Sequence, residues 1–145
     1  MAVCTFFGHR ECYGLDEAIL RQAIADLIEQ GVDTFYVGNQ GQFDALVRIV
    51  LRQLQKDYPH IRYSVVLAYL PVEKREYEVM SDTMYPEGLE TGPLKFAIDR
   101  RNQWMLSRAD FVICYIRRTW GGAYKFARTA KLREKTVINL GSIQL

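Results

Sequence analysis

The chain has 145 residues, of which 49% are hydrophobic and 25% are charged, a composition typical of one folded domain with its own core. Its 19 basic and 17 acidic side chains give a net charge of +2, which shows no sign of the basic stripe used to bind nucleic acid or membrane surfaces. Every apolar run is shorter than the roughly 20 residues that span a bilayer, and no leader pattern precedes the first run, so we expect a cytoplasmic protein with no membrane partner.

Cysteine and histidine are too few and too scattered to indicate a metal centre. Cys4, Cys12 and Cys114 form no CxxC pair, and of the two histidines His60 follows Pro59 in a turn. An odd number of unpaired cysteines also argues against a disulfide framework. We therefore expect free thiols, no metal and no cofactor.

Short apolar runs alternate with stretches of helical periodicity along the chain. Strands are predicted over 2–7, 33–37, 61–70, 110–116 and 136–140. Helices are predicted from residue 15 or 16 to a cap at 31, and over about 42–56, 94–109 and 123–133. This alternation predicts an α/β fold, a Rossmann-like three-layer sandwich with a mostly parallel sheet of about five strands and helices on both faces.

One segment, at about 71–93, interrupts this rhythm within an otherwise single domain over 1–145. It is rich in charged residues and prolines and shows no clear periodicity. A stretch of this length inside a compact domain is either a functional flap or a solvated crossover, and both remain open at this stage.

Three predicted strands end in loops that contain glycine: Gly8-His9-Arg10, Gly38-Asn39-Gln40-Gly41, and the loop that ends with Gly121-Gly122-Ala123. A helix follows the second and third loops, and the free N–H groups at a helix N-terminus suit a phosphate. If the five strands lie in the order 3-2-1-4-5, the strand order reverses between the first and fourth strands. All three loops then meet at one edge and form a pocket for a nucleotide or phosphate.

Arginine and polar side chains near these loops are candidates for ligand contact. Arg10 directly follows Gly8 and His9, so we expect its guanidinium to bind phosphate, whereas Arg117 and Arg118 either do the same or only solvate their loop. His9 could bond a ligand or transfer a proton. The candidate ligand-binding residues are Gly8, His9, Arg10, Gly38, Asn39, Gln40, Gly41, Asp44, Arg101, Asn102, Arg117, Gly121, Gly122 and Ala123.

Three carboxylates, Asp44, Glu87 and Glu90, are candidate catalytic residues. Asp44 lies in the first turn of a predicted helix, where it either complements the helix dipole or contacts ribose hydroxyls. Glu87 and Glu90 belong to the insertion. Cleavage of an N-glycosidic bond requires a carboxylate near an oxocarbenium-like centre, and the sequence does not choose among these three.

The order of these motifs, with GHR, GNQGQFD, RRN on a helix and then GGA, resembles that of the SLOG superfamily of LOG and DprA-type Rossmann-like proteins, and within it the small YpsA-like branch. The resemblance spans nearly the whole chain. It implies a nucleotide pocket formed by Gly8, Arg10, Gly38, Gly41, Asp44, Gly121 and Gly122. LOG enzymes are phosphoribohydrolases whose signature places threonine and glutamate after the double glycine, where this chain has Ala123-Tyr124-Lys125-Phe126. LOG relatives form dimers, so the resemblance also points to a homo-oligomer.

Three functions follow from these observations. The first is a domain that binds a nucleotide-like small molecule as a sensor. The second is an enzyme that cleaves or transfers at the N-glycosidic bond of a nucleotide. The third is a DprA-like module that binds single-stranded nucleic acid, and the near-neutral net charge counts against nucleic acid as a partner.

Overall fold

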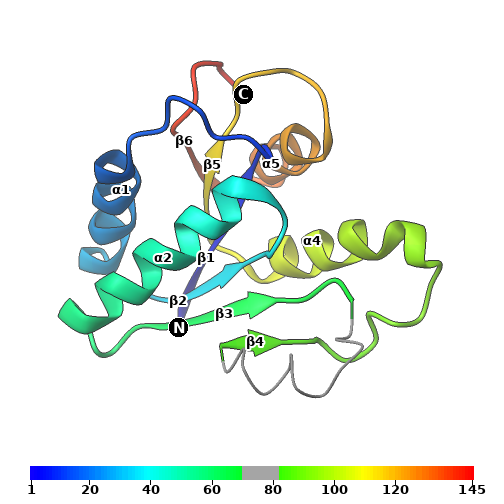
Figure 1. Ribbon diagram of the computed structural model, residues 1–145, viewed down its shortest axis with the longest axis horizontal. Coiled ribbons are helices and arrows are strands. Elements are labelled where there is room, and N and C mark those ends of the chain that lie inside the picture. Colours follow the sequence, from blue (N-terminus) through cyan, green and yellow to red (C-terminus); the bar gives the residue numbers. More distant parts are fainter. Residues whose placement is uncertain (70–81) are drawn as a thin grey trace.

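A parallel sheet forms the centre of the computed structural model, which describes residues 1–69 and 82–145 (Figure 1). Within that part the sheet has six strands in the order β4-β3-β2-β1-β5-β6. The strands are β1 (Ala2–Gly8), β2 (Val32–Val37), β3 (Arg62–Val66), β4 (Thr83–Met84), β5 (Phe111–Tyr115) and β6 (Thr136–Asn139). The helices are α1 (Glu17–Glu29), α2 (Gly41–Asp57), α4 (Ala97–Arg108) and α5 (Gly122–Leu132), with the 3-10 turn η1 (Leu94–Phe96) before α4.

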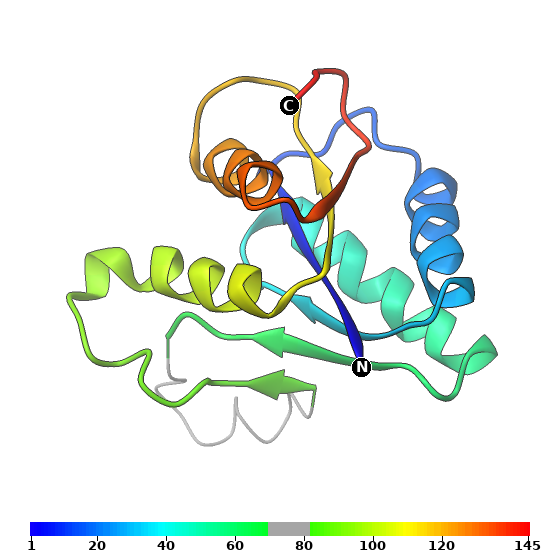
Figure 2. The same cartoon turned by 180° about the vertical axis from the view of Figure 1, so that it is seen from behind.

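The helices cover both faces of the sheet, as Figures 1 and 2 show from opposite sides. On one face Leu20 of α1 and Val47 of α2 are fully buried in the larger apolar cluster, and on the other Met105 of α4 and Phe126 of α5 are buried in a second cluster. Burial of each such side chain contributes roughly 1.5–3 kcal/mol. The predicted Rossmann-like three-layer α/β fold is therefore confirmed.

The strand order reverses beside β1, as the sequence predicted. The expected order 3-2-1-4-5 corresponds to β3-β2-β1-β5-β6, and β1 pairs with β2 on one side and with β5 on the other. The register places Gly8 opposite Tyr115, so the carboxyl ends of β1 and β5 lie next to each other. The loops that leave these two strands diverge to different faces of the sheet, and a crevice opens between them.

Two details differ from the prediction. The third strand ends at Val66, short of the predicted 61–70, and the sheet gains β4 from the insertion, so it has six strands where about five were expected. Asp82, just before β4, is held by a bidentate bond from Arg48, with Nη2 at 2.7 Å from Oδ1 and Nε at 2.9 Å from Oδ2. Arg48 lies on α2 and β4 pairs with β3, so the start of the described part of the insertion, 82–93, is held by both the helix and the sheet. Residues 70–81 lie outside the described residues.

No helix in ranges 1–69 and 82–145 has the length and apolar character needed to cross a bilayer.

Candidate functional site

A cavity of about 240 Å³ lies where the strand order reverses, at the carboxyl end of β1. Its walls come from β1 and its exit loop, the turn before α2, the first two turns of α4, and the loop between β5 and α5. The lining residues are Phe6, Phe7, Gly8, His9, Arg10, Gln40, Asp44, Ile98, Asp99, Arg101, Asn102, Met105, Arg118, Gly122 and Ala123.

The structure brings together most of the residues that the sequence singled out for ligand contact. Those that line the cavity are Gly8, His9, Arg10, Gln40, Asp44, Arg101, Asn102, Gly122 and Ala123. Those that do not line it are Gly38, Asn39, Gly41, Arg117 and Gly121. The three glycine loops therefore meet at one edge of the sheet.

At three of the glycines a side chain would clash with a neighbour or strain the backbone. A Cβ at Gly8 would lie 2.2 Å from Cδ2 of Phe43, which packs α2 against β1. A Cβ at Gly38 would lie 2.7 Å from Oδ2 of Asp44, and Gly41 has a φ of +86°, in the left-handed region that glycine adopts without strain. These glycines let the first turn of α2 approach the ends of β1 and β2.

Gly122, by contrast, has no packing reason to lack a side chain. A Cβ at this position would meet nothing within 4 Å, because it would stand at the open N-terminus of α5. Gly121 before it has a φ of +94°, which turns the chain into the helix. The missing side chain leaves the first N–H groups of α5 accessible from the cavity, which is the property that an anion site requires.

Arg101 is the most unusual residue of the cavity because only 2% of it is exposed. Its Nη1 donates to the carbonyl oxygen of Val66 at 3.0 Å and to Oδ1 of Asn39 at 3.3 Å, and its Nε donates to Oδ1 of Asn102 at 2.8 Å. All three acceptors are neutral. Among the described residues no carboxylate oxygen lies within 4.0 Å of this guanidinium.

Burial lowers the pKa of Arg101, and the charge of Asp44 opposes that effect only in part. A guanidinium nevertheless stays protonated in proteins, so the charge is enclosed at a cost of several kcal/mol by general estimates. An anion in the cavity would offset this cost, because the cavity gives it access to the guanidinium.

Asp44 is the buried carboxylate of the site, with 8% of it exposed. Its Oδ2 accepts the backbone N–H of Gln40, the residue before α2, at 2.9 Å, so the side chain reaches back from the first turn to cap the start of the helix. Burial raises the pKa of Asp44 to about 6, against the opposing effects of the Gln40 N–H and of Arg101. Asp44 therefore combines a structural cap with an ionisable group that faces the cavity.

His9 ties the loop after β1 to the loop after β5. The backbone N–H of Arg117 donates to its Nε2 at 3.1 Å. Burial lowers the pKa of His9, and Arg118 and Arg117 lower it further. A neutral imidazole that accepts at Nε2 carries its proton on Nδ1, so His9 retains one donor for another group.

The two neighbouring arginines of the loop between β5 and α5 have different surroundings. The Nη1 of Arg117 donates to the carbonyl oxygen of Tyr13 at 2.7 Å, outside the cavity lining. Arg118 lines the cavity instead, and its Cζ lies 4.0 Å from the ring centre of Trp120. The sequence left both arginines open, with only Arg117 among the candidate residues, whereas the structure places Arg118 at the cavity.

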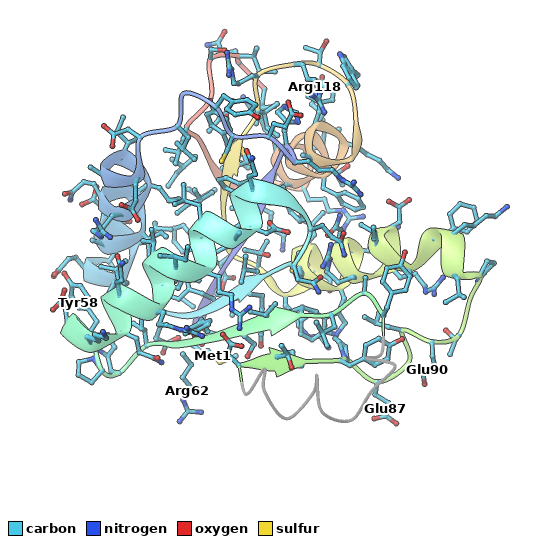
Figure 3. All side chains as sticks on the ribbon, viewed as in Figure 1. Met1, Tyr58, Arg62, Glu87, Glu90 and Arg118 are labelled. Carbon is cyan, nitrogen blue, oxygen red and sulfur yellow. The ribbon has the colours of Figure 1, made fainter. Side chains whose placement is uncertain are left out.

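The carboxylates of the insertion lie far from the glycine loops. Figure 3 shows Glu87 and Glu90 at the outer side of the segment after β4, at the other end of the view from Arg118. Both glutamates are exposed and neither lines the cavity. Asp99 of α4 lines it instead, paired with Lys125 at 3.4 Å.

Several lining residues were missed from the sequence, although helical spacing could have indicated those on α4. The lining residues of α4, Ile98, Arg101, Asn102 and Met105, recur at the spacing of one helix face, so the choice of Arg101 and Asn102 could have been extended to the whole face.

Among the described residues no group of three or more His, Cys, Asp or Glu gathers to hold a metal ion. Cys4, Cys12 and Cys114 are free cysteines in the structure.

No protein-family model matches this sequence, and no curated protein matches it. Among the solved structures that share the fold are two of DNA processing protein A. DNA processing protein A (DprA) from Streptococcus pneumoniae has a TM-score of 0.73 at 17% identity, over 98% of this chain and 51% of that chain. DprA from Helicobacter pylori, whose structure gives insight into its single-stranded DNA binding mode, has a TM-score of 0.66 at 15% identity, over 99% of this chain and 66% of that chain.

The TM-scores show a shared fold, and the low identities show nothing beyond it. This chain spans about half of the first neighbour and just under two thirds of the second. The comparison overturns one prediction: the inference from net charge that counted against nucleic acid as a partner is wrong, because a neighbour of this fold binds single-stranded DNA. The physical reason is that binding of nucleic acid depends on the local charge of the binding surface and not on the net charge of the whole chain. Three guanidinium groups line the cavity here, although the whole chain carries only +2.

Proposed function

We propose that this chain binds single-stranded nucleic acid by holding a backbone phosphate in the cavity beside β1. The observation that carries the proposal is Arg101, a 2% exposed cation that lines the cavity with no carboxylate within 4.0 Å in the described part of the chain. Phosphate is the anion that a guanidinium fork and a helix N-terminus both bind well.

The other donors of the site support the same ligand. Arg10 and Arg118 are exposed side chains that line the cavity, and the open N-terminus of α5 at Gly122 faces it. Of the two lining carboxylates, Asp99 is paired with Lys125, which leaves the charge of Asp44 against those of Arg10, Arg101 and Arg118. The balance of charge within the cavity is therefore positive, in contrast with the chain as a whole.

The fold neighbours favour nucleic acid over a free nucleotide as the ligand. DprA from H. pylori has the same fold and a single-stranded DNA binding mode. Because this chain spans only part of either DprA, the activities of those whole proteins are not carried over. The YpsA-like branch and the cytoplasmic location stay predictions.

The test is fluorescence anisotropy with a labelled oligothymidine of about 12 nucleotides at several salt concentrations. We expect binding that weakens as salt rises, and an Arg118→Ala variant that binds about tenfold more weakly with a salt slope reduced by about one. Arg118 is exposed, so its loss should leave the fold intact.

The matched control is Arg62→Ala. Arg62 is an exposed arginine at the start of β3, on the opposite side of the molecule from Arg118 (Figure 3). We expect this variant to bind as the wild type does. An absence of binding by the wild type at low salt, or an equal loss in both variants, would refute the proposal.

A second candidate function rests on Asp44. Phosphate binding does not need a buried carboxylate, whereas a sugar hydroxyl would donate to one, so a free nucleotide is the alternative ligand. Incubation with nucleoside monophosphates and NAD derivatives, followed by chromatography for free base, tests cleavage, and a thermal shift tests binding. A thermal shift without released base supports a sensor, and released base that disappears in Asp44→Asn supports an enzyme.

A further inference from the structure

Trp120 is an exposed indole at the rim of the cavity. It lies in the loop between β5 and α5, and 64% of it is exposed. Arg118 on one side and Gly122 on the other both line the cavity. Removing an indole from water is favourable, and its flat face can stack on a base, so this ring could take part in binding a ligand that enters the cavity beside it.

The other tryptophan shows what a structural role looks like in this fold. Trp104 on α4 is half-buried, with its ring edge-on to Tyr36 at 5.0 Å between centres. Arg108 also stacks on it, with Cζ at 4.3 Å from the ring centre. Trp104 therefore packs against the sheet, whereas the ring contact of Trp120 is with Arg118.

We propose that Trp120 stacks on the base of the nucleotide whose phosphate occupies the cavity, an inference that rests on the proposed function. Arg118 joins the two parts of the contact, because its guanidinium lies 4.0 Å from the indole centre and also lines the cavity. A phosphate bound there places its own nucleoside beside the loop. The side of the indole that Arg118 does not cover then receives the base.

The chemistry of this contact favours a base over a protein side chain. Arg118 lines the positively charged cavity and also contacts the ring, so a ligand that touches both would carry negative charge next to a flat apolar group. A nucleotide has both groups next to each other, a negatively charged phosphate and a flat base. Because every base presents a π face, stacking on Trp120 is tolerant of sequence, so we expect little preference among bases.

The experiment compares Trp120→Ala and Trp120→Phe with the wild type. Each protein is titrated with an oligothymidine of about 12 nucleotides and with an abasic oligonucleotide of the same length, which keeps the phosphates but lacks the bases. We expect Trp120→Ala to bind oligothymidine about tenfold more weakly and Trp120→Phe to recover most of that loss. All three proteins should bind the abasic oligonucleotide equally.

Intrinsic fluorescence gives a second readout, with Trp104→Phe as the matched control. Oligothymidine should quench the wild type and Trp104→Phe. It should leave the emission of Trp120→Phe nearly unchanged, because Trp104 is half-buried against Tyr36, whereas Trp120 is exposed beside Arg118. The affinity of Trp104→Phe should equal that of the wild type.

The outcomes separate the two proposals. If the wild type binds oligothymidine and Trp120→Ala binds it as tightly, or if the variant loses as much affinity for the abasic oligonucleotide, the stacking role is overturned and the phosphate site stands. If the wild type binds neither oligonucleotide, the proposed function fails and the stacking role fails with it.

Discussion

Replacement of Asp44 by asparagine should stabilise the ligand-free protein at neutral pH. Burial raises the pKa of this carboxyl from 3.8 to about 6, so the folded state holds the proton more tightly than the unfolded chain does. At 1.36 kcal/mol for each unit of pKa, ionisation of Asp44 costs about 3 kcal/mol of folding free energy. Asparagine carries no charge to bury, and its Oδ1 can still accept the N–H of Gln40.

The sign of the pH dependence follows from the same two pKa values. Below about pH 4 the carboxyl is protonated in both states and the penalty is absent; above about pH 6 it is ionised in both states and the penalty is complete. The advantage of Asp44→Asn over the wild type should therefore be up to about 3 kcal/mol at pH 7, and it should shrink through pH 6 and pH 5 until it vanishes near pH 4.

Urea unfolding followed by circular dichroism at these pH values measures this difference directly. Asp99→Asn is the control, because Asp99 also lines the cavity but its side chain is 42% exposed, so we expect no comparable gain. The reasoning is refuted if Asp44→Asn is no more stable than the wild type at pH 7, or if its advantage does not change with pH. A stabilising substitution at a cavity would agree with a carboxylate retained for function.

Three further predictions concern the same cavity. The affinity for an oligonucleotide should rise as the pH falls from 7 to 5, because protonation of Asp44 removes a negative charge next to the phosphate, and anisotropy should show no such rise for Asp44→Asn. Gly122→Val should abolish binding while the melting temperature stays close to that of the wild type, because its side chain points into open space. Gly8→Ala should instead lower the melting temperature, because its Cβ would lie 2.2 Å from Phe43; similar melting temperatures for the two variants would contradict this account of the glycines.

The sequence by itself determined the architecture of this protein. Apolar runs that end at glycine and helices with one apolar face are local patterns, and they place Gly8, Gly38 and Gly122 at the ends of parallel strands or at the start of the next helix. Right-handed crossovers then leave few ways to order the strands. The edge of the sheet at which a ligand would bind followed from these patterns alone.

Only the tertiary structure decided which charged side chains face that edge. Arg101 is 62 residues away from Asn39, and its burial depends on how α4 crosses the end of the sheet, which no local pattern encodes. The same holds for the choice of Arg118 over Arg117 and for the outward position of Glu87. A side chain's environment is set by elements distant in the sequence, so net charge and spacing could not show that a nearly neutral chain encloses a positively charged cavity.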